Sequence, residues 1–218
     1  DSIERFIGWE WIYRDSFAAQ IVLPIGISFY TFQLLSYLID VRRGDAEPTR
    51  SLVKFWVYIA LFPQLVAGPI MRGTELIPQL DDIHKKTIRW QEIKYGILLV
   101  IWGLMKKVLF ADRLADIVDP IFAQGLEIGG TDAWIGAFAF GFQIYFDFSA
   151  YSDMALGLGY IIGIKLVLNF NSPYISSNPS EFWARWHISL SRWIRDYIYI
   201  GLGGNRRGPI RVHFNLLA

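Results

Sequence analysis

Long apolar runs alternate along the chain with short charged segments. Three of these runs are prominent, at residues 18–41, 52–71 and 133–164, and the first carries no charge until Asp40. About 20 residues of α-helix cross the ~30 Å hydrocarbon core of a bilayer. The third run exceeds one perpendicular crossing, so we expect a tilted helix, a broken helix or two helices there. The pattern predicts an all-α, polytopic membrane protein.

The second run, residues 52–71, is interrupted by Pro63, Gly68 and Pro69. Basic side chains lie on both of its flanks, and cytoplasmic loops of membrane proteins carry an excess of such residues. If both flanks are cytoplasmic, the segment enters the membrane and returns, which requires protein or a wet cavity around its irregular backbone. We interpret it as a re-entrant element, with a kinked membrane span as the alternative.

Two shorter segments lie between the second and third runs. Residues 95–110 are apolar and contain Lys106 and Lys107, which we expect to snorkel to an interface. Residues 111–128 mix aliphatic side chains with Asp and Arg, and Pro120 should break a helix there. This second segment is typical of an interfacial position.

Residues 180–200 have the pattern of an amphipathic helix, with Ser180 as N-cap and Gly201 at the end. At helical spacing, one face carries an aromatic and apolar stripe: Trp183, His187, Leu190, Ile194 and Tyr197. His187 is either a structural histidine or a general base, because a desolvated imidazole can stay neutral and accept a proton from a hydroxyl. A polar ring near lipid-depth segments is costly unless it faces a cavity, which favours the base.

Two carboxylates, Asp147 and Asp153, lie within the third apolar run. A charge at such a position usually faces the protein interior and has a partner. Six residues of helix separate two side chains by about 240°, so the pair is not a shared acid–base dyad. We predict structural roles for both, with Lys165 or an arginine as the partner.

Composition supports a membrane protein and narrows the chemistry. Of the 218 residues, 53% are hydrophobic, 17% aromatic and only 19% charged. The net charge of +1 gives no basic field for nucleic acid, and the absence of cysteine excludes disulfides and thiolate chemistry. No metal-ligand spacing is present, so we expect no metal. Both ends resemble cuts through a longer protein.

A glycine-rich basic segment follows the amphipathic pattern at residues 201–208. Its backbone N–H groups and the guanidinium of Arg206 could cradle a phosphate. Neither established phosphate-loop spacing is matched, however, and no strand precedes the segment. A helix end followed by a cytoplasmic basic loop is the favoured interpretation.

Five longer strings resemble the membrane-bound O-acyltransferase family, in collinear order over most of the chain. Within that family they are most similar to the branch that acetylates bacterial alginate. The strings are PIGISFYTFQLLSYLIDVRRG (24–44), FPQLVAGPIMR (62–72), FQIYFDFSAYSDMALGL (142–158), NFNSPY (169–174) and EFWARWHISLSRWIRDYIYIGLGGNR (181–206).

The resemblance implies a ring of transmembrane and re-entrant helices around a tunnel, of which residues 1–218 would be an internal portion with no separate soluble domain. It implies acyl transfer to a hydroxyl and two histidines, the first of which corresponds to His187. The second belongs to a later Trp-His-Gly motif that His213 does not match. We therefore expect these residues alone to be inactive.

The resemblance also implies substrates and partners. We expect acetyl-CoA as the acyl donor rather than a bound cofactor, and an exported polysaccharide such as alginate as the acceptor, in a multi-pass protein of the inner membrane. Membrane lipid and other O-acetylation proteins are the expected partners, with no nucleic acid. The residues expected to bind substrate are Arg185, Arg195, Arg206 and Asn171.

Three alternatives stay open at the level of sequence. A transporter or channel would use the intramembrane carboxylates and the interrupted second run. A second branch of the same family moves D-alanyl groups during teichoic-acid modification. A non-catalytic scaffold in an export complex would lack the second histidine.

Overall fold

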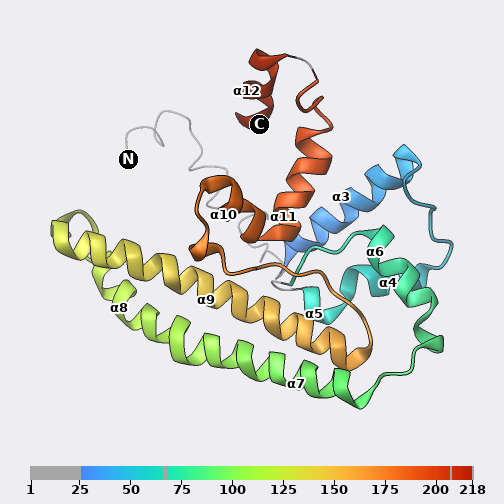
Figure 1. The fold of residues 1–218 in the computed structure, drawn as a ribbon, viewed down its shortest axis with the longest axis horizontal. Helices are drawn as coiled ribbons and strands as arrows, with labels where there is room; N and C mark the ends of the chain where they lie inside the picture. The colour runs from blue at the N-terminus through green and yellow to red at the C-terminus, as the bar shows by residue number, and fades with distance from the viewer. Residues whose placement is uncertain (1–25, 66–67, 207, 218) are drawn as a thin grey trace, which may run out of the picture.

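A computed structural model describes residues 26–65, 68–206 and 208–217, and every regular element in these ranges is helical (Figure 1). The all-α prediction is confirmed for this part of the chain. The first apolar run is described only from Gly26 onward, so its beginning lies outside the described residues. The part that is described forms α3 (Ile27–Arg43), which ends at Gly44 with a φ of 81°.

A long helical hairpin forms one side of the molecule (Figure 1). Its first arm runs without a break through α7 (Trp90–Met105), the π-helical turn η3 (Lys106–Ala111) and α8 (Asp112–Phe122). The 3-10 turn η4 (Gly125–Glu127) leads into the second arm, α9 (Gly130–Ile162), a single helix of 33 residues. The third apolar run is therefore one helix rather than two.

The predicted break at Pro120 in the first arm is wrong. Pro120 does not end a helix, because α8 continues through it to Phe122. Proline removes one N–H from the ladder and its ring crowds the carbonyl oxygen of the residue four before it, which can kink a helix without ending it. Lys106 and Lys107 bind carboxylates of α9, and their position at an interface stays a prediction.

Glycines allow the two arms of the hairpin to approach closely. A Cβ atom added at Gly96 would lie 2.5 Å from the carbonyl oxygen of Gly157, and one added at Gly157 would lie 2.5 Å from that of Gly96. At Gly103 an added Cβ would lie 2.6 Å from the carbonyl oxygen of Ala150. Small residues at such crossings are typical of helix packing in membrane proteins.

Four short helices form the opposite side of the molecule together with α3. They are α4 (Leu52–Ala60), α5 (Phe62–Leu65), α6 (Gly73–Asp81) and the 3-10 turn η2 (Ile83–Lys85). Their core contains Tyr37, Leu76 and the fully buried Tyr58. The Tyr58 hydroxyl lies 3.0 Å from the carbonyl oxygen of Gln33 and 3.3 Å from that of Met71, which ties α3 to the segment before α6.

The second apolar run is broken. Its helices α4 and α5 have nine and four residues, and residues 68–72 are non-helical and mostly buried. Nine residues of helix extend about 14 Å, roughly half of a bilayer core. This geometry supports a re-entrant element, although residues 66–67 lie outside the described part and the topology stays a prediction.

After α9 the chain folds back along that helix, where Phe170 and Tyr174 contact its aromatic rings. The elements that follow are η5 (Pro173–Ile175), α10 (Pro179–Arg185), α11 (Ile188–Trp193), the π-helical turn η6 (Ile194–Tyr199) and α12 (Pro209–Leu217). The continuous helix predicted over residues 180–200 is wrong, because the chain breaks between α10 and α11. Asn178 rather than Ser180 is the N-cap, and its side chain accepts the Glu181 N–H at 2.9 Å.

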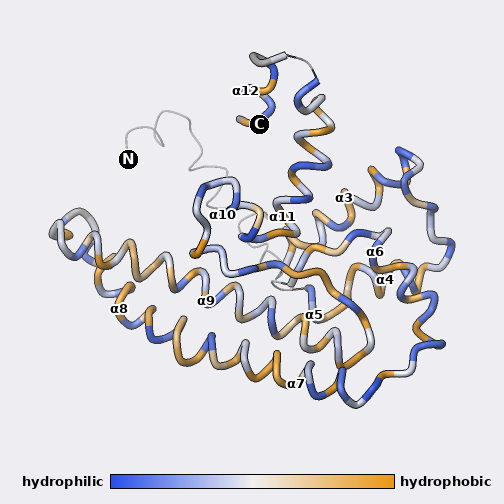
Figure 2. Tube along the Cα trace, viewed as in Figure 1, coloured by the Kyte–Doolittle hydropathy of each residue, from blue (hydrophilic) through white to orange (hydrophobic). Residues whose placement is uncertain are grey.

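Apolar and polar residues are mixed along most helices (Figure 2). Within the described residues, no helix combines the length and the apolar character needed to be scored as a membrane span. Large apolar side chains are nevertheless exposed on both hairpin arms, among them Leu98 at 63% and Phe138 at 66%.

The glycine contact in the hairpin predicts a difference between two Gly→Ala substitutions in α9. Gly157→Ala should lower the free energy of unfolding by roughly 1–3 kcal/mol, because its methyl group would meet backbone of the other arm. Gly141→Ala should be neutral or stabilising by up to about 1 kcal/mol, since alanine is the better helix former. At Gly141 the nearest atom to an added Cβ is the Tyr174 hydroxyl, at 3.7 Å.

Thermal unfolding of the two purified variants in the same detergent would measure this difference. Equal midpoints for Gly157→Ala and Gly141→Ala would contradict the close glycine contact between the arms.

Candidate active site

The backbone changes direction at His187, between α10 and α11. His187 has a φ of 41°, one of two positive values among the described non-glycine residues, the other being Ser172 at 46°. Such backbone costs on the order of 1 kcal/mol and is concentrated at functional sites. The segment 169–171 forms backbone hydrogen bonds to residues on both sides of the break. Asn169 accepts the Ile188 N–H at 2.9 Å, and the Asn171 N–H donates to the Arg185 carbonyl at 3.0 Å.

The side chain of Asn169 determines the orientation of the His187 ring. Asn169 is completely buried, and its Oδ1 lies 3.0 Å from Nδ1 of His187. The same oxygen accepts the Ser189 backbone N–H at 3.2 Å and the Ser189 hydroxyl at 3.0 Å. Because a backbone N–H can only donate, the atom facing it must be the amide oxygen. Nδ1 of His187 therefore carries the proton, and Nε2 keeps its lone pair.

Aromatic rings enclose the imidazole. The ring of Phe148 meets it edge-on at 4.6 Å between centroids, and that of Phe170 lies nearly parallel at 6.3 Å. This burial lowers the pKa of His187 to about 4, since an apolar surrounding disfavours the imidazolium. His187 itself is not part of a helix, because it lies at the break between the seven residues of α10 and the six of α11. Its imidazole is neutral at physiological pH.

The aromatic stripe predicted beside His187 is wrong in part. Trp183 and Ile194 are 59% and 44% exposed, because the break after α10 removes the helical phase on which the stripe depended. The rings that surround the site come from other segments as well. They form a connected cluster of Tyr145, Phe148, Phe170, Tyr174, Phe182 and Trp186.

Hydrogen bonds connect the His187 segment to the broken second apolar run. The backbone N–H of Ile70 donates to the Ser189 hydroxyl at 3.0 Å, and that hydroxyl donates to Asn169. Two residues further on, the Arg72 guanidinium forms an ion pair with Asp196 at 2.6 Å. Residues 68–72 therefore lie against α11 and η6. Sequence reasoning missed Asn169 and Ser189, although the string NFNSPY contains the first of them.

The structure pairs Asp147 and Asp153 with neighbouring lysines on the other arm of the hairpin. Nζ of Lys107 lies 2.7 Å from Asp147, and Nζ of Lys106 lies 2.6 Å from Asp153. Lys107 also binds Asp112 of its own arm at 2.8 Å. The prediction of Lys165 or an arginine as partner is wrong, while the structural role of the two carboxylates stays a prediction.

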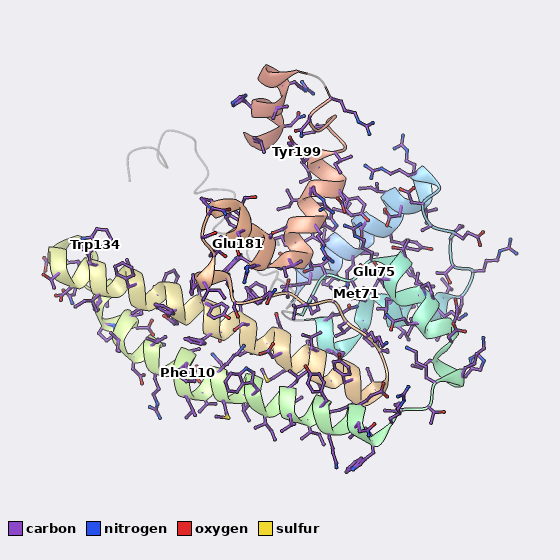
Figure 3. The ribbon with its side chains drawn as sticks, in the orientation of Figure 1. Met71, Glu75, Phe110, Trp134, Glu181 and Tyr199 are labelled. Carbon is purple, nitrogen blue, oxygen red and sulfur yellow. The ribbon has the colours of Figure 1, made fainter. Side chains whose placement is uncertain are left out.

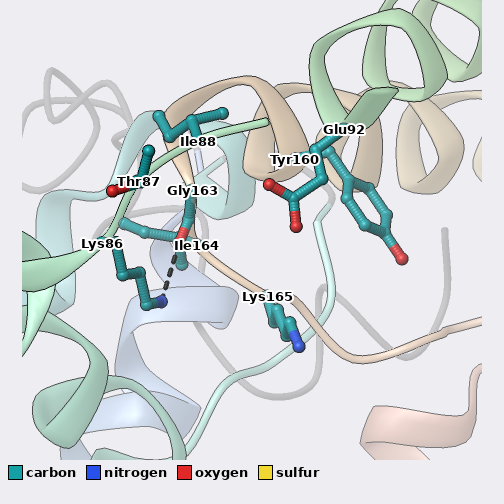
Figure 4. Close-up of a pocket in the computed structure, with 8 residues that line it drawn as sticks. All are labelled: Lys86, Thr87, Ile88, Glu92, Tyr160, Gly163, Ile164 and Lys165. Carbon is teal, nitrogen blue, oxygen red and sulfur yellow. Dashed lines mark hydrogen bonds between the residues drawn. The ribbon is translucent and has the colours of Figure 1, made fainter. Parts of the chain in front are cut away.

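Lys165 lies instead at the end of the hairpin, in a small cavity of about 200 Å³ (Figure 4). Lys86 closes one wall of this cavity by donating to the carbonyl oxygen of Gly163 at 2.7 Å. The carboxylate of Glu92 and the ring of Tyr160 form another wall. This cavity has no part in the His187 cluster.

The predicted substrate-binding residues do not form one group. Arg185 is paired with Glu181 of α10 at 2.6 Å, and Arg195 with Asp196 at 2.6 Å (Figure 3 shows Glu181). Arg206 and Asn171 are exposed. Of the four, only Arg185 and Asn171 contact each other: the Asn171 N–H donates to the Arg185 carbonyl at 3.0 Å, and the Arg185 guanidinium donates to the Asn171 carbonyl at 3.5 Å. Their roles stay predictions. Among the described residues, no group of three or more His, Cys, Asp or Glu is arranged to hold a metal ion.

Comparison with known proteins assigns the family. The sequence model of the membrane-bound O-acyltransferase family matches residues 48–214, which include the whole His187 cluster. The chain belongs to the membrane-bound O-acyltransferase family. This family is membrane-bound.

Curated relatives within the membrane-bound O-acyltransferase family differ in their acceptors. The chain is 51% identical over 197 residues to the probable alginate O-acetylase AlgI of Azotobacter vinelandii, covering 90% of the chain and 39% of that protein. It is 37% identical to the peptidoglycan O-acetyltransferase of Helicobacter pylori (94% and 44% covered). It is 31% identical to the teichoic acid D-alanyltransferase of Streptococcus thermophilus (82% and 44% covered). The chain spans about two fifths of the length of these relatives.

The Asn169 contact predicts the protonation state of His187. In the full-length protein labelled with ¹⁵N-histidine, His187 should stay in the neutral Nδ1–H form until the pH falls to about 4. An unfolded histidine binds a proton below about pH 6.5. His187 should therefore make the fold less stable as the pH falls from about 6.5 to about 4, because only the unfolded state takes up the proton.

Two asparagine variants test whether the Asn169 side chain fixes this tautomer. Asn169→Ala removes the acceptor of the Nδ1 proton and should produce a mixture of both neutral tautomers. Asn171→Ala, two residues away with an exposed side chain, should leave the spectrum unchanged. A spectrum of Asn169→Ala with a pure Nδ1–H signal would contradict the assigned role of Asn169.

Proposed function

We propose that the protein transfers acetyl groups to hydroxyls of an exported polysaccharide such as alginate. The neutral His187 with its free Nε2 carries this proposal, because it is a preorganised base within a family of O-acyltransferases. The 51% identity to a probable alginate O-acetylase supports the acceptor class. The 37% identity to a peptidoglycan O-acetyltransferase makes a cell-wall glycan the second candidate acceptor.

The chemistry that His187 would support is a direct acyl transfer. Nε2 accepts the proton of a sugar hydroxyl as the hydroxyl oxygen attacks the carbonyl carbon of an acetyl thioester. The tetrahedral intermediate then expels the thiolate, and the imidazolium returns the proton to it. Asn169 stabilises the imidazolium through the Nδ1–H bond, as the orienting carboxylate does in a catalytic triad.

Acetyl-CoA is the proposed donor. Arg206 is exposed and could bind its phosphates, whereas Arg185 and Arg195 would first have to exchange their carboxylate partners. The resemblance places a second histidine in a later Trp-His-Gly motif, and we propose that it acts with His187 across a tunnel. Other O-acetylation proteins are proposed partners in delivering the polysaccharide.

We propose that the helices form part of a ring in the inner membrane, with α4 and α5 entering and leaving on the same side. The broken helices and the buried segment 68–72 support this arrangement, since irregular backbone at membrane depth requires protein around it. A transporter using Asp147 and Asp153 as an ion path is less favoured, because both carboxylates are already neutralised by lysines. The D-alanyl branch is less favoured by its lower identity of 31%.

His187→Ala in the full-length protein should abolish polysaccharide acetylation without affecting membrane insertion. Loss of a general base typically costs 10²- to 10⁴-fold in rate. Acetyl content of the exported polymer and protein abundance in the membrane fraction would be measured together.

Two further variants complete this test. His187→Gln retains hydrogen-bonding groups but cannot accept a proton near neutral pH, so it should be as inactive as alanine. His84→Ala changes an exposed histidine of η2 and should keep normal acetylation. Near-normal acetyl content in His187→Ala would exclude a role of this residue as base.

Single cysteines test the path of the second apolar run. The 218 residues contain no cysteine, and Arg50 and Thr74 are both exposed on its two flanks. In a cysteine-free protein, Arg50→Cys and Thr74→Cys should react with a membrane-impermeant thiol reagent from the same side. Labelling in permeabilised cells verifies that both sites are reactive. Labelling from opposite sides would establish an ordinary span.

A further inference from the structure

A second cavity, separate from the His187 cluster, lies between the C-terminal end of α3 and η6. It has a volume of about 580 Å³, and two arginines, Arg42 and Arg43, form its polar wall. The apolar part of its lining includes Ile39, Ile198 and Leu202. The cavity therefore combines two guanidinium groups with an aliphatic surface.

Within the described residues, Arg42 and Arg43 form no ion pair. Two carboxylates lie next to the cavity-lining Tyr197, Asp40 through a hydrogen bond and Asp196 as the preceding residue in the chain. Asp40 accepts the Tyr197 hydroxyl with both oxygens, at 2.7 and 2.8 Å, and Asp196 is bound by Arg72 and Arg195.

The position of Arg43 is set by neutral contacts. Its guanidinium carbon lies 5.6 Å from the centre of the Tyr197 ring, and Nη1 lies 3.4 Å from the carbonyl oxygen of Asp196. Stacking on an aromatic ring holds a guanidinium in place while leaving its other N–H groups available. Arg42 is exposed beside it. Arg43 is held in place by these contacts, and together the two side chains present donors of the geometry that binds phosphate oxygens.

We propose that this cavity binds a phosphate group attached to an apolar body, and that an anionic phospholipid of the surrounding membrane supplies it. The two arginines would hold the phosphate, and Ile39, Ile198 and Leu202 would contact the glycerol and the first methylenes. Basic pockets between helices of membrane proteins bind lipid head groups by this combination. The apolar wall favours a lipid over a soluble phosphate ester, which would leave that wall exposed to water.

A purely structural role for the arginines makes a different prediction. Cations near a helix C-terminus stabilise the helix through its dipole, whether or not an anion is bound. Arg42 and Arg43 are the last two residues of α3. Their replacement would then lower stability in every lipid equally. The proposed site instead requires an effect that depends on anionic lipid.

Calorimetric titration of the full-length protein in a neutral detergent can test the site. The probes are dihexanoyl phosphatidylglycerol, dihexanoyl phosphatidylcholine and inorganic pyrophosphate. Phosphatidylglycerol should bind more tightly than either of the other two. Arg42→Gln should weaken its binding about fivefold, from the roughly 1 kcal/mol that each basic residue contributes near an anionic lipid.

Matched variants make the result specific. Arg42→Lys keeps the charge and should bind nearly as the wild type, and Arg50→Gln removes an exposed arginine outside the cavity and should have no effect. Unchanged phosphatidylglycerol binding in Arg42→Gln would overturn the proposal, as would a loss of thermal stability that is independent of lipid. Equal or tighter binding of pyrophosphate would assign the cavity to a soluble phosphate ester and overturn the lipid assignment.

Discussion

The candidate site depends on the buried oxygen of a single amide, Oδ1 of Asn169. This atom accepts three hydrogen bonds, one from His187 and two from Ser189. Without it, the ring of His187 would have no fixed tautomer, and two donors of α11 would be buried without a partner. An unsatisfied buried donor costs about 1–3 kcal/mol, so the same contact that prepares the histidine for chemistry also stabilises the turn that carries it.

The effect of this oxygen extends beyond the site. The Ser189 hydroxyl accepts the backbone N–H of Ile70, so the non-helical segment before α6 is held by the same group of atoms as the imidazole. Ser152 of α9 lies 3.4 Å from the Asn169 amide nitrogen on the other side. Three parts of the chain that are far apart in sequence therefore share one polar centre inside an aromatic surrounding.

The class of the fold and the identity of His187 were accessible from sequence, because both depend on local signals. Apolar runs indicate helices, and the string around His187 matches a family. The break at His187 was not accessible, since residues 180–200 have good helical periodicity and the positive φ is stabilised by contacts with the remote segment 169–171. Asn169 was missed for the same reason. Its role exists only after α9 and α11 have come together.

The ion pairs of the hairpin bear on how the protein is inserted during synthesis. Lys106 pairs with Asp153 across the hairpin, whereas Lys107 pairs both with Asp147 of the other arm and with Asp112 of its own. The first arm alone would therefore leave Lys106 without its carboxylate, and the second arm alone would leave both aspartates without a lysine. A single charge at the centre of a bilayer costs roughly 2.5–3.5 kcal/mol on insertion scales. If the hairpin enters the bilayer as proposed, this cost favours insertion of the two arms as one paired unit.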